Sequence, residues 1–364
     1  MSRQLTYAFW AVHGLVLAIA LLDGANNAAS FVSIALGSRV LRIERLLVYA
    51  FLGELIGTTV LAPEIYTRLL PLTAYAVHSP ASISIALAAA TAWIALATKL
   101  KVISPISVVL LGILAGTAVS NPFTYLKFFG TYLCIWVAQI AMSSAITVLV
   151  IRGSRRLAKI SDALTVLLPL TTLAYVFANA LKLKNATLAA VAIVVALLGI
   201  ALVSVLRLPQ VSAISVAIPL TSAAVAHGTN DAALMLAILS LANAYESCVP
   251  PRFSSAVLGL AISLGIVLWA RRISEALARG VVLLDLATAK NIYTSVFITT
   301  ALLITLGMPT PMTFSVLGSF IGVGIGKGFS VVAVKTALKL VATAFATVLA
   351  ISVCVALTSL IPVP

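Results

Sequence analysis

Apolar segments long enough to cross a lipid bilayer recur from one end of the chain to the other. Residues 128 to 150 and 186 to 206 are two examples, and each provides the roughly 20 helical residues that a crossing needs. With 62% of its 364 residues hydrophobic and only 9% charged, the chain is not an ordinary soluble domain. The segments also lack the two-residue alternation of an outer-membrane β-barrel. We therefore predict an all-α polytopic membrane protein.

The apolar segments divide the chain into about 12 predicted transmembrane helices. The first and the eighth, at 5 to 38 and 211 to 243, are longer than one crossing needs, and each carries a polar, glycine-containing centre. This pattern predicts helices that are broken at the bilayer midplane. The other crossings are predicted at 46–62, 82–98, 104–120, 128–150, 163–179, 186–206, 253–269, 290–307, 311–326 and 330–361.

Two short motifs place the halves of the chain in register. Residues 24 to 27 read Gly-Ala-Asn-Asn, and residues 228 to 231 read Gly-Thr-Asn-Asp. When they are superposed, the loop after the first long helix carries three arginines between 39 and 45, whereas its counterpart carries only Arg252. After the next crossing the loop of the second half carries the larger number of basic residues. Equivalent loops therefore differ in charge, as expected when they lie on opposite sides of the membrane.

This alternation predicts two inverted repeats. By the positive-inside rule, the loops at 39–45, 152–159 and 271–279 lie in the cytoplasm and both chain ends lie outside. The loop with Lys99 and Lys101 falls on the cytoplasmic side by the same count. The predicted divisions are a first repeat at 1–151, a connecting segment with two transmembrane helices at 152–210, and a second repeat at 211–364.

The net charge of +14 is explained by these basic loops, so we expect membrane lipid and no nucleic acid as a partner. The three cysteines have no spacing typical of a disulfide framework or a metal site, and we predict no cofactor. No metalloprotease or serine hydrolase motif is present, which predicts a protein that is not an enzyme. We expect a multi-pass protein of the plasma membrane and leave its oligomeric state, including a homodimer, open.

The two motifs predict a binding site for a small anion. Gly24 and Gly228 permit unwound backbone, and Asn26, Asn27 and Asn230 stand where the next half-helix would begin. Free N–H groups and the positive end of the helix dipole attract anions at such a position. In the alternative interpretation, the polar side chains of the motifs only bond neighbouring helices together.

Carboxylates within the apolar segments point to a coupling cation. No Lys or Arg falls at the predicted centre, so a doubly charged oxyanion would need helix dipoles, protons or cations to neutralise it. Asp231, Glu54 and Asp23 are the candidate sites for Na⁺ or H⁺, because ionisable groups at membrane depth are expensive and usually functional. Asp23 is equally well explained as a helix cap. For His227 we favour a neutral side chain that bonds a neighbouring helix.

The two motifs resemble the duplicated GANDVANA signature of the inorganic phosphate transporter (PiT) family. Further similarity covers "FLGELIG" at 51–57, "WIALATKLK" at 93–101, "WARRISEAL" at 269–277 and "GMPTPMTFSVLGSFIGVGIGKG" at 307–328. The resemblance implies secondary transport of phosphate by alternating access, driven by sodium or protons. It also implies that the two motifs and two Ser-Thr-Thr-His motifs line the site.

The chain departs from this family pattern at the proposed site. Asn27 stands where the family has Asp, and both Ser-Thr-Thr-His motifs are replaced, by Pro-Ile-Ser-Val at 105–108 and Pro-Met-Thr-Phe at 311–314. Because the two halves have changed in parallel, we interpret the site as remodelled.

One hydroxyl remains in each replaced motif. Ser107 and Thr313 occupy equivalent positions, and Ser104 and Thr310 lie three residues earlier as second candidate donors to the substrate. These hydroxyls could equally bond their own helix backbone.

The leading hypothesis is a cation-coupled importer of inorganic phosphate. Sulfate, another tetrahedral oxyanion, is the alternative, because the site has lost a carboxylate that could accept a proton from phosphate. A passive anion channel is a further alternative.

Overall fold

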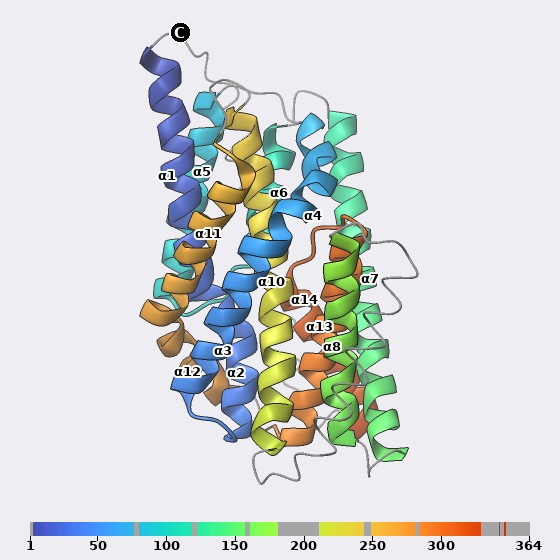
Figure 1. The fold of residues 1–364 in the computed structure, drawn as a ribbon. Coiled ribbons are helices and arrows are strands. Elements are labelled where there is room, and N and C mark those ends of the chain that lie inside the picture. The colour runs from blue at the N-terminus through green and yellow to red at the C-terminus, as the bar shows by residue number, and fades with distance from the viewer. Residues whose placement is uncertain are drawn as a thin grey trace.

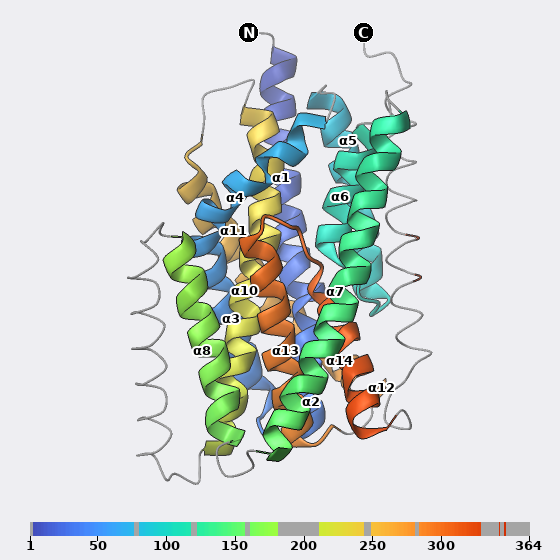
Figure 2. The ribbon, with the colours of Figure 1, turned by 90° about the vertical axis from the view of Figure 1, so that its right-hand side faces the viewer.

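The computed structural model describes residues 3–75, 80–117, 122–156, 161–180, 211–243, 249–280 and 284–328, with two single positions, 342 and 346. Every regular element in these ranges is helical. Figures 1 and 2 show an elongated bundle whose helices run along its long axis. Within the described residues, five helical stretches are long and apolar enough to cross a membrane, which identifies a multi-pass membrane protein: Phe9–Ser38, Ile43–Leu69, Gly130–Arg156, Ala213–Leu241 and Pro251–Ala278.

The first half of the chain contains a long helix, a helix interrupted by a π-turn, a pair of helices and a further long helix. Its elements are α1 (Arg3–Asn26), α2 (Ala28–Ser38), α3 (Ile43–Ile56), η1 (Gly57–Leu61), α4 (Ala62–Leu69), η2 (Leu70–Tyr75), α5 (Pro80–Lys99), α6 (Ile106–Thr117), α7 (Pro122–Arg156) and α8 (Ser161–Ala180).

The second half repeats the order of long helix, helix with π-turn, and helix pair. Its elements are α10 (Val211–Asn243), α11 (Pro251–Gly265), η4 (Ile266–Ala270), α12 (Arg271–Gly280), α13 (Leu286–Thr305) and α14 (Met312–Lys327). The predicted crossings at 186–206 and 330–361 lie outside the described residues, so the count of 12 stays a prediction.

The two halves are interleaved. α10 packs against α3 and α4, while α1 packs against α11, so the first long helix of each half contacts the second helix of the other. In Figures 1 and 2, α1 and α2 run from the top of the bundle to its base, and α10 runs from the base to the top. An inverted repeat requires opposite directions of this kind; the repeat itself and its boundaries stay predictions.

The prediction that both long helices are broken at their motifs is wrong for the second motif. α10 is one continuous helix through Gly228. At the first motif the interruption is a single residue, Asn27, whose backbone stays right-handed helical at φ −75° and ψ −38°. Its N–H still donates to the Asp23 carbonyl at 2.8 Å. The motif residues therefore lie within nearly continuous helices and do not start separate half-helices.

The motif glycines serve close packing in place of unwinding. A Cβ at Gly24 would lie 1.8 Å from the carbonyl oxygen of Ile262, and one at Gly228 would lie 2.6 Å from Oε2 of Glu54. Such distances are far below van der Waals contact, so only glycine lets α1 approach α11 and α10 approach α3 this closely. The sequence could not distinguish this requirement from a need for unusual backbone angles.

The clear breaks in helical structure lie between α5 and α6 and between α13 and α14. Residues 102–105 and 308–311 are non-helical there. α5 and α6 lie in the half of the bundle nearer the N-terminus, and α13 and α14 lie in the opposite half (Figure 2). Each break therefore joins two helices into a hairpin, 80–117 and 286–327. The crossings predicted at 82–98, 104–120, 290–307 and 311–326 correspond to the four helices of these hairpins, and their spanning of the membrane stays a prediction.

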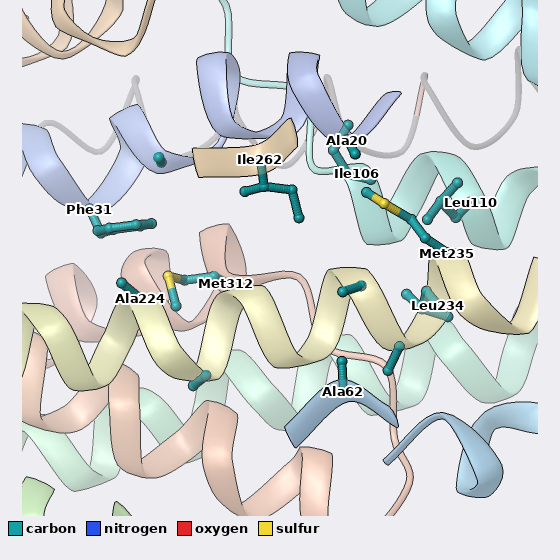
Figure 3. Close-up of a cluster of buried hydrophobic side chains, with 14 of the residues drawn as sticks. Ala20, Phe31, Ala62, Ile106, Leu110, Ala224, Leu234, Met235, Ile262 and Met312 are labelled. Atoms are coloured by element: carbon teal, nitrogen blue, oxygen red, sulfur yellow. The ribbon is translucent and has the colours of Figure 1, made fainter. Parts of the chain in front are cut away.

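α10 forms the centre of the bundle, and all of its residues from Ser222 to Leu239 are buried. Figure 3 shows apolar side chains around it, including Ile262 of α11, Phe31 of α2 and Met312 of α14. A polar contact also joins α13 to α2: the Tyr293 hydroxyl accepts from Ala35 N–H at 2.8 Å and donates to the Phe31 carbonyl. Tyr293 therefore stands between a donor and an acceptor that would normally bond each other within α2.

Close packing at the first motif can be tested with Gly24→Ala. The added Cβ overlaps backbone atoms of Ile262, so we expect a loss of about 1–3 kcal/mol of stability. Gly14→Ala on the same helix is the control, since a methyl group added there would meet no atom within 4 Å and alanine favours a helix. Thermal unfolding of the purified protein in detergent measures both, and equal midpoints would show that α1 and α11 are not in this contact.

Candidate functional site

Four ionisable side chains meet in the interior of the bundle. Asp23 comes from α1, Glu54 from α3, and His227 and Asp231 from α10, and none is more than 2% exposed. Nδ1 of His227 lies 2.6 Å from Oε1 of Glu54, and its Nε2 lies 3.3 Å from Oδ2 of Asp231 and 3.9 Å from Oδ1 of Asp23. His227 therefore bridges carboxylates from three helices, and we call these four residues the acidic cluster.

Asn27 joins the carboxylates of the two motifs. Its Nδ2 donates to Oδ1 of Asp23 at 2.9 Å and reaches Oδ2 of Asp231 at 3.4 Å. An aspartate at this position would place another carboxylate beside these two and remove the donor. The amide therefore reduces the negative charge of the cluster and connects its members.

The acidic cluster contains more acceptors than donors. Oδ2 of Asp23, Oε2 of Glu54 and Oδ1 of Asn27 are buried without a hydrogen-bond partner. Even a protonated His227 supplies one positive charge against three carboxylates, and buried unpaired charge is strongly unfavourable. Ligand atoms of Asp23, His227 and Asp231 all lie within 4.8 Å of one another, close enough to share one cation. The cluster is therefore suited to bind protons or a metal cation.

Asn26 holds the tip of the first hairpin. Its Oδ1 accepts from the Ser104 N–H at 2.8 Å, and its Nδ2 donates to the Val102 carbonyl at 2.8 Å and to Oγ1 of Thr98 at 3.2 Å. The indole of Trp93 donates to the Ser104 hydroxyl at 3.0 Å. The side chain of Asn26 thus satisfies backbone groups that the end of α5 leaves free.

Asn230 does the same for the second hairpin and also contacts the first. Its Oδ1 accepts from the Thr310 N–H at 3.0 Å, and its Nδ2 donates to the Ser107 hydroxyl at 2.8 Å and to Asp231 at 2.6 Å. Ser107 donates in turn to Oδ1 of Asp231 at 2.5 Å. Equivalent asparagines therefore bind equivalent hairpin tips. Both tips lie next to the acidic cluster, the first through Ser107 and the second through Thr310.

The candidate backbone N–H donors to an anion come from the helices of the two hairpins. α6 begins at Ile106 and α14 at Met312, and the first N–H groups of each helix have no intrahelical acceptor. The positive ends of two helix dipoles are therefore directed to the region of the cluster. The motif helices do not supply the half-helix N-termini that we predicted for them, while the predicted binding of an anion by helix N-termini stays a prediction.

The predicted hydroxyl donors differ in their contacts. Only Ser107 bonds a cluster member, so bonding to its own helix backbone does not explain its hydroxyl. Ser104 is occupied by Trp93, Thr310 is buried with an unpartnered Oγ1, and Thr313 is buried in the first turn of α14. The structure records no hydrogen bond between Thr313 and the acidic cluster.

Sequence reasoning underestimated His227. It does bond a neighbouring helix, as predicted, but that bond is to Glu54, and its other nitrogen faces Asp231. The only sequence signal was its position directly before the motif glycine. Thr98 and Trp93, which complete the Asn26 network, carried no signal beyond the resemblance of their segment to the family.

Residues 23–356 match the model of the phosphate transporter family. The chain belongs to this family. A protein of Chlamydia trachomatis serovar D, named a candidate phosphate permease, is 30% identical over 130 residues, which cover 34% of this chain and 30% of that protein. A solved sodium-dependent phosphate transporter matches 98% of this chain and 100% of its own with a TM-score of 0.81. At 18% identity that likeness shows a shared fold.

Family membership confirms the resemblance inferred from the two motifs. The family is one of transporters, which supports the prediction that the chain is not an enzyme. It does not assign individual residues, so the roles of the motif residues rest on the geometry of the site.

The hydrogen bonds from Asn26 to the tip of the first hairpin can be tested with Asn26→Ala. The variant leaves the buried Ser104 N–H without its partner and removes the bond to the Val102 carbonyl, so we expect a loss of about 1–3 kcal/mol. Ser38→Ala is the control, because that hydroxyl bonds only a carbonyl of its own helix and its loss should change stability by less than about 0.5 kcal/mol. Thermal unfolding in detergent compares them; similar midpoints would exclude Asn26 as the anchor.

Proposed function

We propose that this chain is a cation-coupled secondary transporter that imports inorganic phosphate across the plasma membrane by alternating access. The observation that carries the proposal is the acidic cluster, whose buried acceptor oxygens lack partners at the place where both hairpin tips meet the motif helices. Family membership supports phosphate transport.

The cluster explains why transport would be coupled. A phosphate at the N-termini of α6 and α14 would be repelled by Asp231 and Asp23 unless protons or cations neutralise them. The anion and the cation then bind best together, and either alone binds poorly. We propose Na⁺ or H⁺ as the coupling ion; the solved neighbour of the same fold is named sodium-dependent, which supports Na⁺. Oxygen-rich sites suit such hard cations.

The unpartnered carboxylate oxygens also favour phosphate over sulfate. At neutral pH phosphate carries a proton that must be donated to an acceptor, whereas sulfate offers acceptors only. The oxygens Oδ2 of Asp23 and Oε2 of Glu54 are available to accept such a proton. They compensate for the carboxylate that the chain lacks at Asn27.

The enclosure of the site supports a carrier in place of a passive channel. The four members of the acidic cluster are at most 2% exposed, so an ion reaching them requires a change of conformation. The interleaved halves, with hairpins in opposite ends of the bundle, provide two bodies that could exchange access between the two sides.

The coupling is tested in proteoliposomes with labelled phosphate, an imposed sodium or proton gradient, and unlabelled sulfate as competitor. We expect uphill uptake that sulfate inhibits weakly. Asp231→Asn should raise the cation concentration for half-maximal uptake by about tenfold, because a lost charge contact costs on the order of 1–3 kcal/mol. Glu275→Gln, which changes a carboxylate on α12 paired with Arg271, is the control. Gradient-independent uptake would refute coupling, and equal cation dependence in both variants would refute the role of Asp231.

Asn27 provides a second test of the site. Asn27→Asp adds a carboxylate beside Asp23 and Asp231, so phosphate affinity should fall at low sodium or high pH and recover when cations or protons are abundant. Asn27→Ala only removes the donor, and it should weaken binding by about threefold to tenfold at every cation concentration. Uptake measured against phosphate at two sodium concentrations and two pH values separates the variants. If both behave like the parent, Asn27 does not affect the substrate.

A further inference from the structure

A basic cleft of about 320 Å³ lies beside the end of α5. Lys99 and Lys101 line it from the α5 side, and Arg272 lines it from α12. The rest of its wall is formed by Leu22, Ala95, Thr98, Trp269 and Ile273. Among the described residues that line the cleft there is no carboxylate. The charged side chains that line it are therefore all cationic.

The three cations of the cleft are not neutralised by carboxylates. The neighbouring Arg271 pairs with Glu44 at 3.1 Å and with Glu275 at 3.0 Å. In the described part of the chain, Lys99, Lys101 and Arg272 take part in no such ion pair. Like charges gathered around one cavity repel one another, so an anion between them is stabilised.

Backbone geometry at Lys101 is a second, independent feature of the cleft. α5 ends with bonds from Val102 N–H to the Ala97 carbonyl at 2.9 Å and from Lys101 N–H to the Thr98 carbonyl at 3.1 Å. This closure places Lys101 in the left-handed region at φ 58°, a position that glycine normally occupies. The chain keeps a cationic side chain where glycine would fit the backbone better.

The cleft is separated from the first motif by a single layer of side chains. Thr98 lines the cleft, and its hydroxyl accepts the hydrogen bond from Asn26. Leu22, also in the wall, directly precedes Asp23. Figure 1 places α12 and the end of α5 on the same side of the bundle. The charge pattern predicts the basic segment of α12 on the cytoplasmic side, and the cleft joins this segment to the tip of the first hairpin.

We propose that this cleft is a second phosphate-binding site, at the cytoplasmic mouth of the path to the acidic cluster. It binds the phosphate group of an oxyanion, either free inorganic phosphate or a phospholipid headgroup. That phosphate released from the buried site passes through this cleft rests on the proposed transport function. The binding of phosphate in the cleft does not depend on that function. The three cations without carboxylate partners and the wall shared with the Asn26 network carry the inference.

Trp269 in the wall supplies a direct reporter. Iodide, an anionic quencher, should collect in the cleft and quench its fluorescence, and inorganic phosphate should protect it. The difference between the full-length protein and Trp269→Phe isolates this signal from the other tryptophans. The measurement is made on purified protein in an uncharged detergent, at constant ionic strength.

Charge variants assign the binding to the cleft. Lys101→Gly and Arg272→Gln should each raise the phosphate concentration needed for protection by about threefold to fivefold, since each removes one partly exposed charge. Lys101→Gly also relieves the left-handed backbone, so a lower affinity cannot be attributed to misfolding. Arg271→Gln, which removes a paired charge next to the cleft, is the matched control and should leave protection unchanged within about twofold.

Two further arms decide the source of the phosphate and the link to transport. Phosphatidylcholine vesicles with and without phosphatidic acid, free of inorganic phosphate, test the headgroup: protection there but not by inorganic phosphate identifies a lipid site. Asp231→Asn should keep full protection although its uptake is impaired, because Asp231 does not line the cleft. Failed uptake by the unsubstituted protein with intact protection would refute the proposed function but not the binding of phosphate in the cleft. Absence of protection by either ligand, or equal effects of Lys101→Gly, Arg272→Gln and Arg271→Gln, would overturn the proposal.

Discussion

The structure depends on keeping negative charge in the interior of an apolar bundle. Asp23, Glu54 and Asp231 are removed from water and share one histidine. Attraction to His227 offsets only part of the cost of burying them. The neutral amide of Asn27 and the positive helix ends of α6 and α14 reduce the remaining cost. The site keeps uncompensated negative charge until a cation binds. The binding of an anion can therefore be coupled to the binding of that cation.

Close helix packing sets the distances in this cluster. Gly228 lets α10 approach α3 until Glu54 reaches His227, and Gly24 lets α1 approach α11 so that Asp23 faces the same space. Asn26 and Asn230 then fix the hairpin tips against the motif helices. Each motif thus combines a glycine that permits contact, an asparagine that binds a hairpin and a third polar residue that faces the partner motif.

The sequence was sufficient for the membrane class, the family and most of the charged site, because each depends on local composition or on a motif. Burial of Asp23, Glu54 and Asp231 follows from their position in apolar segments. Helix continuity could not be predicted, because a glycine that permits unwinding and one that permits packing look the same in a sequence. The place of His227 depends on Glu54, a residue far away in the sequence that only the tertiary fold brings near.

The contact of Tyr293 with α2 has a mechanical consequence. Because the hydroxyl stands between Phe31 and Ala35, it ties α2 to α13, and α2 also packs against α12. α1 packs against α5 and α11. Asn27, the interrupted residue between α1 and α2, therefore lies where the chain passes from one set of neighbours to the other. A change in the angle between the two helices would alter the Asp23–Asn27–Asp231 chain of contacts, so the joint between α1 and α2 and the charge-bearing centre are the same few atoms.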